Sequence, residues 1–167
     1  MEKNGKYALL KIRKIADYQF GRGVGKVLFP DNVEITFSKA TGKIRHVYLD
    51  GKRIATLRPK DGLFSLTIDG AERIVKNVRP LRFWVKVSDE ASSFVADGRS
   101  VFAKHVLDAD EEIRPKEEVI VLDAKGNVLA VGRALLTGKE MKAFKTGVAV
   151  KVRKGVNEGK IKKCLSK

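Results

Sequence analysis

Apolar residues recur at near-helical spacing between positions 7 and 20, at positions 10, 12, 15, 16 and 20. This spacing predicts an amphipathic helix whose remaining surface is largely basic. The pattern ends at Gly21 and is followed by Gly21-Arg22-Gly23-Val24-Gly25. We interpret these glycines as the end of the helix and the turn after it.

Short alternating apolar runs occupy positions 33–78. The runs IRHVYL, RIATLR and LFSLTI are flanked by Asp50-Gly51, Asp61-Gly62 and Asp69-Gly70. An Asp-Gly pair between such runs is a strong hairpin signal, because both residues tolerate positive φ. Three in succession predict an antiparallel meander. Residues 1–78 are therefore expected to form an α+β domain, with the helix packed on the meander.

The second half of the chain reads as short strands separated by short helices. A boundary is expected at Arg79-Pro80, since proline favours an extended residue before it. The predicted strands are LRFWVKV, RSVFAKHVL, a hairpin turning at positions 125–127, and GVAVKVRKG with Val148, Val150 and Val152 inward. Ser88 and Thr137 are the expected caps of the two short helices. With no long crossover helix, residues 79–155 predict a small mixed or antiparallel barrel, followed by a basic tail, 156–167.

Composition narrows the class of protein. The 167 residues are 43% apolar, which excludes a disordered basic tail, and carry a formal net charge of +15. Residues 1–80 hold 17 Lys/Arg against 8 Asp/Glu, residues 81–138 hold 8 against 10, and residues 139–167 hold 10 against 2. A generic lysine-rich surface usually balances Lys with Glu. The uneven excess favours a polyanion partner, of which a nucleic-acid backbone is the commonest.

The lack of a recognisable targeting signal and the single cysteine both favour a cytoplasmic protein. No apolar run reaches the roughly 18 residues of a membrane span, and no signal peptide is recognisable, so no membrane partner is expected. The single cysteine, Cys164, cannot form an internal disulfide. This pattern fits a reducing compartment.

No arrangement of residues predicts catalysis. His46 and His105 have no Ser, Cys or second His at a known spacing, and we interpret both as half-buried strand histidines. The acidic run 108–112 lacks the calcium-loop pattern and is expected to be a solvated loop. The glycines at 21, 23 and 25 match neither dinucleotide nor P-loop spacing, although Arg22 and Lys26 beside them could meet a phosphate. We therefore expect no catalytic residues, metal or cofactor, and a binding protein rather than an enzyme.

Two segments resemble known families. The run SDEASSFVADGRSVFAKHV at 88–106 resembles the opening of a PUA domain, and the resemblance continues through EVIVLD, the turn at 125–127, VGRA and GVAVKVR. IRKIADYQFGRG, GKRIATLR and DGLF resemble the segment before the PUA domain of archaeal archaeosine tRNA-guanine transglycosylase. The chain thus resembles the C-terminal part of that enzyme. The catalytic aspartates and cysteine-rich zinc site of its barrel have no counterpart here.

The resemblance implies a mainly β, six-stranded pseudobarrel with short helices that binds structured RNA, often the acceptor end of tRNA. Its usual RNA surface corresponds to positions 88–98, 99–104 and 151–153. Because the first of these carries Asp89, Glu90 and Asp97, we expect its backbone and small side chains to approach RNA. Candidate RNA-binding residues are Gly98, Arg99, Ser100, Phe102, Lys104, Arg133, Lys151, Arg153 and Lys154, with Arg13, Lys14, Arg22 and Lys26 in the first domain.

Phe102 leaves two alternatives open. It could stack on a terminal base, or belong to the core, since alternation requires either Val101 or Phe102 to face inward. The core position is the favoured interpretation.

The sequence therefore predicts a non-catalytic RNA-binding protein, for tRNA, acting alone or as the targeting subunit of a transglycosylase-type modification enzyme. The alternative is a ribosome-associated or ribosome-assembly factor that contacts ribosomal RNA and protein in a ribosomal subunit.

Overall fold

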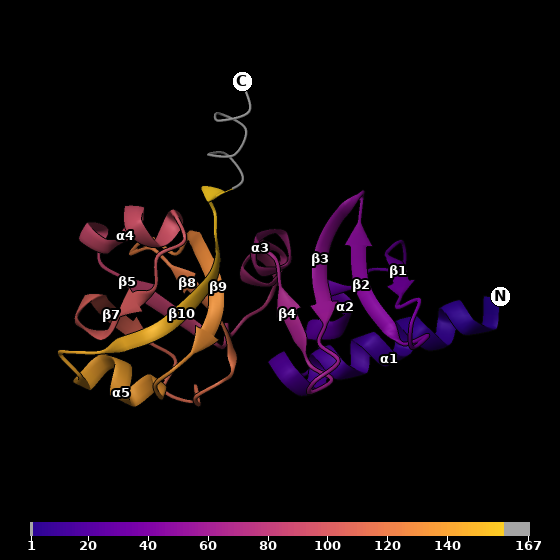
Figure 1. Cartoon of the computed structure of the whole chain (residues 1–167), viewed down its shortest axis with the longest axis horizontal. Helices are drawn as coiled ribbons and strands as arrows, with labels where there is room; N and C mark the ends of the chain where they lie inside the picture. The colour runs from indigo at the N-terminus through magenta and orange to yellow at the C-terminus, as the bar shows by residue number, and fades with distance from the viewer. Residues whose placement is uncertain (1, 159–167) are drawn as a thin grey trace, which may run out of the picture. The chain divides into compact units, whose positions relative to one another are not determined.

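The chain forms two compact units, Met1–Leu81 and Arg82–Lys167 (Figure 1). The computed structural model describes residues 2–158, with side chains from residue 5 onward. Most of the expected basic tail therefore lies outside the described residues. The two units are considered one at a time below.

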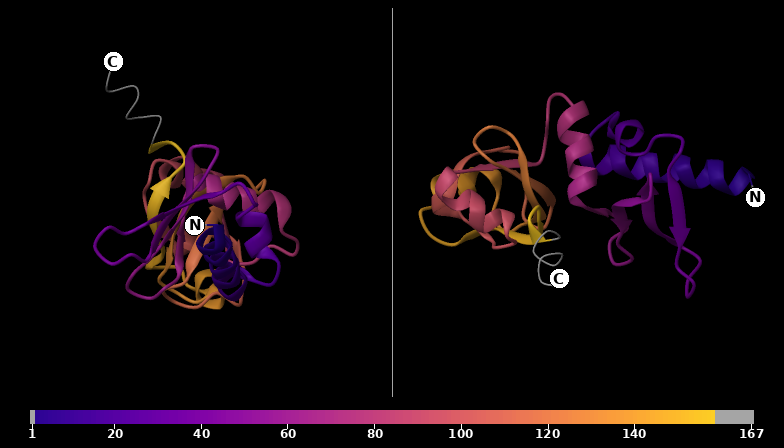
Figure 2. Two further views of the ribbon diagram at one scale, coloured as in Figure 1. Left: turned by 90° about the vertical axis from the view of Figure 1, so that its right-hand side faces the viewer. Right: turned by 90° about the horizontal axis from the view of Figure 1, so that it is seen from above.

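Unit 1 is a four-stranded antiparallel sheet covered on one face by helices. Its elements are α1 (Glu2–Phe20), α2 (Val24–Leu28), β1 (Glu34–Phe37), β2 (Ile44–Leu49), β3 (Lys52–Leu57), β4 (Phe64–Leu66) and α3 (Ile68–Asn77). The strands lie in the order β1-β2-β3-β4, as a meander requires. Both views in Figure 2 show α1 and α2 on the same side of this sheet. The predicted helix on a meander is confirmed.

One stripe of α1 forms the core of unit 1. Ala8, Ile12, Ala16 and Phe20 recur every four residues and are all buried. Because residues four apart share a helix face, this stripe packs continuously on the sheet. Leu10, which the sequence assigned to the apolar face, is exposed, because it lies half a turn away from this stripe.

The three Asp-Gly pairs have different structures. Asp50-Gly51 and Asp61-Gly62 lie in turns with positive φ at Asp50, Gly51 and Gly62, as predicted. The expected third hairpin at Asp69-Gly70 is wrong, because both residues lie in the first turn of α3. The Thr67 hydroxyl accepts a hydrogen bond from the Gly70 amide at 3.2 Å and caps this helix.

The glycines after α1 have two roles. Gly21 has a φ of 122° and ends α1, and Gly23 has a φ of 90° and precedes α2. This part of the turn follows the prediction. Gly25 differs, because it lies inside α2 and packs on the backbone of Arg13, where a Cβ would overlap the Arg13 carbonyl oxygen. The sequence analysis missed α2, which is only five residues long.

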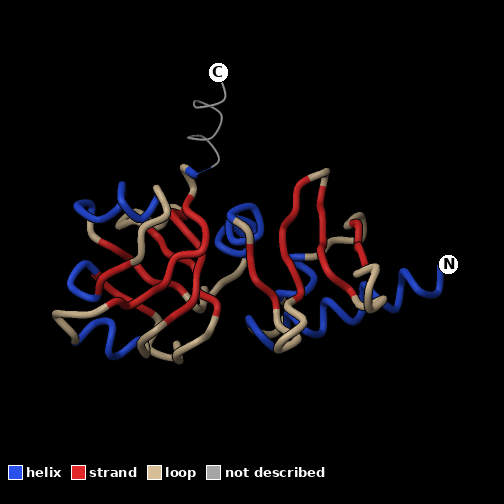
Figure 3. The backbone as a smooth tube through the Cα atoms, viewed as in Figure 1, coloured by secondary structure: helices blue, strands red, loops and turns tan. Residues whose placement is uncertain are grey.

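Unit 2 is a strongly curved six-stranded sheet with short helices outside it (Figure 3). Its elements are β5 (Trp84–Val87), α4 (Asp89–Ala96), β6 (Val101–Phe102), the 3-10 helix η1 (Ala103–His105), β7 (Val106–Ala109), β8 (Glu118–Leu122), β9 (Val128–Ala134), α5 (Gly138–Ala143) and β10 (Val148–Gly155). The order is β6-β10-β9-β8-β5-β7, and only β5 and β8 pair in parallel among the described strands. The pseudobarrel implied by the resemblance is confirmed.

The segment predicted as one strand, RSVFAKHVL, closes this barrel. It divides into β6 and β7, which lie at opposite edges of the sheet and are joined by η1. The single-strand prediction is wrong, because an uninterrupted strand cannot pair at both edges. The three-residue η1 turns the chain from one edge to the other. The sheet is therefore nearly closed.

The caps and the last strand follow the predictions in part. The Thr137 hydroxyl accepts from the Glu140 amide, and Glu140 accepts in return from the Thr137 amide, a complete capping box. Ser88 occupies the N-cap of α4, but its hydroxyl makes no capping hydrogen bond. In β10, Ala149 and Val150 are both fully buried, because the register shifts between Val148 and Val150. The expected strict alternation from Val148 to Val152 is therefore wrong.

The helices were compared with the length and hydropathy of a membrane-spanning helix. Among residues 2–158, no helix combines the length and apolar character that a bilayer crossing requires.

Candidate nucleic-acid interface

The C-terminal end of α4 fixes the position of Arg99. Gly98 has a φ of 102°, the Arg99 amide donates to the Phe94 carbonyl oxygen at 3.0 Å, and the Gly98 amide donates to Val95 at 2.9 Å. These two bonds form a Schellman motif, in which glycine supplies the left-handed residue. The space beside the Gly98 Cα is occupied by the Glu158 side chain. Glycine is therefore favoured here both by its positive φ and by the position of the Glu158 side chain.

A pocket of about 200 Å³ lies beside this helix end. It is lined from α4 by Glu90 and Phe94, from the loop by Arg99 and Ser100, and from β6 and η1 by Phe102 and His105, among others. The Phe94 and Phe102 rings are 56% and 49% exposed. Val101 is 1% exposed and takes the inward position of β6. The favoured core interpretation of Phe102 is therefore wrong, and its ring is available at the surface.

The pocket combines three kinds of side-chain group: aromatic rings, a cation and a carboxylate. Two phenyl rings offer flat apolar faces, Arg99 offers a cation with planar donors, and the Glu90 carboxylate offers an acceptor. Exposed rings beside a guanidinium suit an unstacked nucleobase and its phosphate. Phe94 and His105 were not among the residues predicted from the sequence to bind RNA. Phe94 follows the buried Ala91 by three residues, a spacing that favours the same helix face, so the helical pattern gave no signal that Phe94 is exposed.

A basic pair lies on β10, the neighbour of β6, and on β9, the strand beyond β10. Arg133 on β9 and Lys151 on β10 are directly opposite each other, and both are exposed. Because opposite residues of an antiparallel pair share a face, the two cations project together. Phe102 of β6 lies opposite Val148, which is on the same strand as Lys151, β10. Lys151 is three residues further along, a distance of about 10 Å.

Arg153 has a structural partner. Its guanidinium forms a two-pronged ion pair with Glu118, and the Glu118 side chain is fully buried. The Nη1–Oε1 distance is 2.8 Å. Arg153 is predicted from the sequence to contact RNA. In the structure its charge also compensates a buried carboxylate, and the contact with RNA stays a prediction.

The remaining candidates in unit 2 differ in their availability. Lys104 is exposed on η1, and Ser100 is half-buried at the rim of the pocket. The ammonium of Lys154 lies 3.6 Å from the Glu158 carboxylate. Lys104 is thus available to an anionic ligand, whereas Lys154 is partly neutralised.

The candidates in unit 1 also differ. The Arg13 guanidinium donates to the Phe29 carbonyl oxygen at 2.8 Å and to Asp31 at 2.9 Å, which ties α1 to the segment after α2. Lys14, Arg22 and Lys26 are exposed. Arg13 therefore has a structural role, and the other three remain available as surface cations.

The two histidines have different surroundings. His46 is half-buried in β2, as predicted, with its Nδ1 3.0 Å from the Thr56 hydroxyl. Burial, together with the nearby Arg53 and Arg45, lowers the pKa of His46. His105 lies in η1 rather than in the expected strand.

The acidic run 108–112 is more ordered than a solvated loop. Asp110 accepts hydrogen bonds from the Phe83 and Glu112 amides, and Lys142 pairs with Asp108 and Glu111. The loop prediction holds for positions 110–112, whereas positions 108 and 109 belong to β7. No group of three or more metal-ligating side chains occurs within the described part of the chain.

Comparison with known families agrees with this division of the chain. Residues 10–80 match the patch-forming domain C2 of tRNA-guanine transglycosylase, and residues 83–156 match the PUA domain. Residues 10–80 thus form a C2 domain and residues 83–156 a PUA domain. PUA domains typically bind RNA. The pocket at α4 and β6, with its two exposed rings, thus belongs to a PUA domain, and the resemblance drawn from the sequence is confirmed.

Named relatives place both domains in a longer archaeal protein. The chain is 45% identical to tRNA-guanine(15) transglycosylase of Methanothermobacter thermautotrophicus over 87% of its own length, and 45% identical to that of Pyrococcus furiosus over 92%. These matches cover 22% and 26% of the relatives, in their C-terminal part. The C2–PUA chain therefore spans about a quarter of the length of the curated relatives it matches.

Two solved structures resemble the chain over nearly its whole length. A hypothetical protein from Pyrococcus horikoshii is 26% identical, with a TM-score of 0.73 and 95% of each chain covered. A conserved PUA domain protein from Thermoplasma acidophilum is 20% identical, with a TM-score of 0.66 and the same coverage. The second likeness shows the fold alone.

Proposed function

We propose that the chain binds tRNA through its PUA domain, and that the pocket between α4 and β6 takes an unstacked nucleotide of the acceptor end. In this role the chain acts as a non-catalytic RNA-binding protein, alone or as the targeting subunit of a tRNA-modification enzyme. The observation that carries the proposal is the pocket itself, where Phe94 and Phe102 expose their rings beside Arg99.

The charges near the pocket support this assignment. Arg133 and Lys151 project together from β9 and β10, and Lys104 is exposed on η1, next to β6 in the chain. Phosphates of a stem would meet these cations while an unpaired end enters the pocket, since A-form helices hide their base edges. Similarity to enzymes named tRNA-guanine(15) transglycosylase supports tRNA as the RNA class.

Glu90 gives the pocket a means of selecting bases. A carboxylate accepts hydrogen bonds from exocyclic amino groups, as glutamate does from cytosine N4. Uracil offers a carbonyl oxygen at the corresponding position. The pocket should therefore prefer cytosine or adenine to uracil, and an unpaired CCA end would satisfy it.

The test is a binding titration with the full chain. The probe is a labelled acceptor-stem hairpin with an unpaired 3′ CCA end, compared with the same hairpin ending in UUU. Arg99→Ala with Phe102→Ala should weaken CCA-hairpin binding by at least about tenfold, because one stacked base is worth roughly 1–3 kcal/mol. Glu90→Gln should reduce the preference for CCA over UUU, because an amide can also donate.

The matched control is Arg114→Ala with Phe144→Ala, which removes an exposed arginine and an exposed phenylalanine of unit 2 outside the pocket. This control should bind like the unaltered chain. Equal losses in the two double variants, at equal melting temperatures, would rule out the pocket as the binding site. Preferential binding to ribosomal subunits over tRNA would instead support the ribosome-associated alternative.

A further inference from the structure

The outer face of α1 carries exposed apolar residues that the core of unit 1 does not use. Tyr18 is 85% exposed, Tyr7 69% and Leu10 54%. The helix already buries a complete stripe on the sheet, so these residues form a second apolar strip on the solvent side. A helix that is apolar on opposite sides is typical of an element with a further contact.

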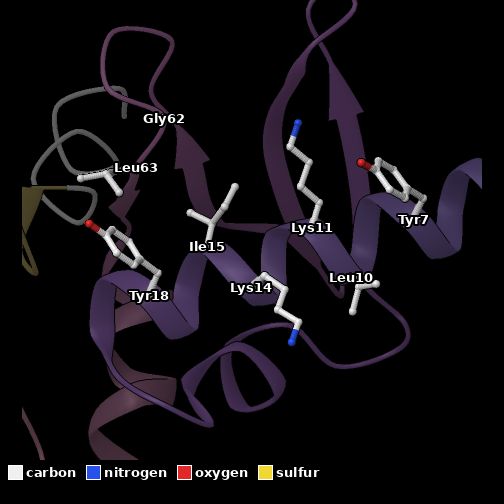
Figure 4. Close-up of a pocket in the computed structure, with 8 residues that line it drawn as sticks. All are labelled: Tyr7, Leu10, Lys11, Lys14, Ile15, Tyr18, Gly62 and Leu63. Atoms are coloured by element: carbon white, nitrogen blue, oxygen red, sulfur yellow. The ribbon is translucent and has the colours of Figure 1, made fainter.

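This strip borders a groove. A pocket of about 430 Å³ is lined by Tyr7, Leu10, Lys11, Lys14, Ile15 and Tyr18 of α1, and by Gly62 and Leu63 of the turn before β4. Figure 4 shows Tyr18 and Leu63 at one end and Tyr7 at the other, with the lysines between them. Tyr7 and Tyr18 are three helical turns apart, about 16 Å along the axis.

The charges around the groove have one sign. Lys6, Lys11 and Lys14 are exposed on α1. Asp17 directs its carboxylate to the Gly25 amide at 2.7 Å. Asp61, beside Gly62, is paired with Arg58 at 2.9 Å. These two acidic groups are therefore engaged inside unit 1, and the exposed lysines are available to an anionic ligand.

Aromatic rings separated by cations match the chemistry of an unpaired nucleic-acid strand. Bases stack on aromatic side chains in a sequence-tolerant way, while the backbone phosphates follow the cations. A paired stem offers phosphates but no free base faces. A protein surface could cover the apolar strip, but it would also need a matching row of carboxylates for the lysines.

We propose that the α1 groove, formed by Tyr7, Leu10, Lys11, Lys14, Ile15, Tyr18, Gly62 and Leu63, binds unpaired nucleotides of RNA. This second site lies in unit 1 and uses none of the residues of the PUA pocket. It rests on the proposed function only in that the ligand is RNA. It adds a site on the C2 domain that prefers single-stranded segments.

The experiment measures binding of two labelled probes to the full chain, a 12-nucleotide single strand blocked at its 3′ end and a blunt duplex of the same sequence. Tyr7→Ala with Tyr18→Ala should weaken single-strand binding by at least about tenfold, because two stacked bases are lost. Duplex binding should remain within about twofold, because its phosphates contact other cations. Tyr7→Phe with Tyr18→Phe should keep single-strand affinity, since phenyl rings still stack.

Two controls isolate the groove. Phe37→Ala removes another exposed aromatic residue of unit 1 and should have no effect on either probe. Lys39→Ala with Lys43→Ala removes two exposed lysines outside the groove and should weaken single-strand binding less than Lys11→Ala with Lys14→Ala.

The outcomes separate the two proposals. If Arg99→Ala with Phe102→Ala weakens hairpin binding while the tyrosine variant binds the single strand like the unaltered chain, the groove proposal is overturned and the proposed function stands. If the tyrosine variant instead converts a dimer to a monomer in sedimentation, the groove is covered by a second copy, and the RNA proposal is overturned. Loss of single-strand binding in a monomeric, folded tyrosine variant supports the groove.

Discussion

At the scale of single residues, Arg153 shows that a cation predicted to contact RNA can also have a partner inside the protein. Arg153 lies in the basic strand segment GVAVKVRKG, which the sequence predicts to expose its cations. Its guanidinium nevertheless pairs with Glu118, 35 residues away in the sequence. Glu118 is fully buried at its side chain, so its charge depends on a nearby cation. Lys151 on the same strand is exposed and has a different role.

This difference gives a stability prediction. Arg153→Ala should lower the free energy of unfolding by about 3 kcal/mol, because it leaves a buried carboxylate uncompensated. Lys151→Ala should change it by no more than about 0.5 kcal/mol. Urea unfolding of the two variants measures both values. Adding Glu118→Gln to Arg153→Ala should recover part of the loss, and equal stability of the two single variants would contradict the buried pair.

At the scale of elements, α3 shows how packing can override a turn signal. Asp69-Gly70 has the residues of a hairpin, but Thr67 caps a helix there and Gly70 packs against β3. A Cβ on Gly70 would overlap the Ile54 carbonyl oxygen. Glycine at this position permits a close helix–strand approach, rather than the positive φ that the sequence suggested.

Two glycine variants test this interpretation. Gly70→Ala should lower the free energy of unfolding by about 1–3 kcal/mol, because backbone atoms of β3 must shift to admit a methyl group. Gly5→Ala is the control, since Gly5 is a helical glycine with open space around its Cα. It should be neutral or stabilising by up to about 1 kcal/mol. Thermal melts compare them, and a neutral Gly70→Ala would show that α3 does not pack this tightly on β3.

At the scale of the whole molecule, charge determines how binding should respond to salt. The net charge of +15 is concentrated in residues 1–80 and 139–167, and several of the cations, among them Arg13, Arg153 and Lys154, are paired within the protein. Net charge alone therefore overstates the number of phosphates that the protein can bind. Exposed candidates outside such pairs include Arg99, Lys104, Arg133 and Lys151.

The salt prediction uses about five phosphate contacts, those four and one from unit 1. Each contact contributes about 0.7–0.9 to the slope of log K against log salt, so the slope for tRNA should lie near −3.5 to −4.5. Titrations between about 50 and 300 mM KCl measure it. A slope near zero would contradict binding through phosphates, whichever residues contact the bases.

Signals carried by neighbouring residues were sufficient to predict much of this protein from its sequence. The helix ending at Gly21, the Asp50-Gly51 turn and the Thr137 cap each depend on residues a few positions apart, so the pattern alone contains them. The PUA domain and its preceding domain were recognisable because their motifs occur in order along the chain. Only the tertiary structure decided that Phe102 rather than Val101 faces solvent, that Phe94 joins it at one pocket, and that Arg153 serves Glu118. Those outcomes depend on how the strands and α4 pack together in the nearly closed sheet, and this packing is set by contacts between residues far apart in the sequence.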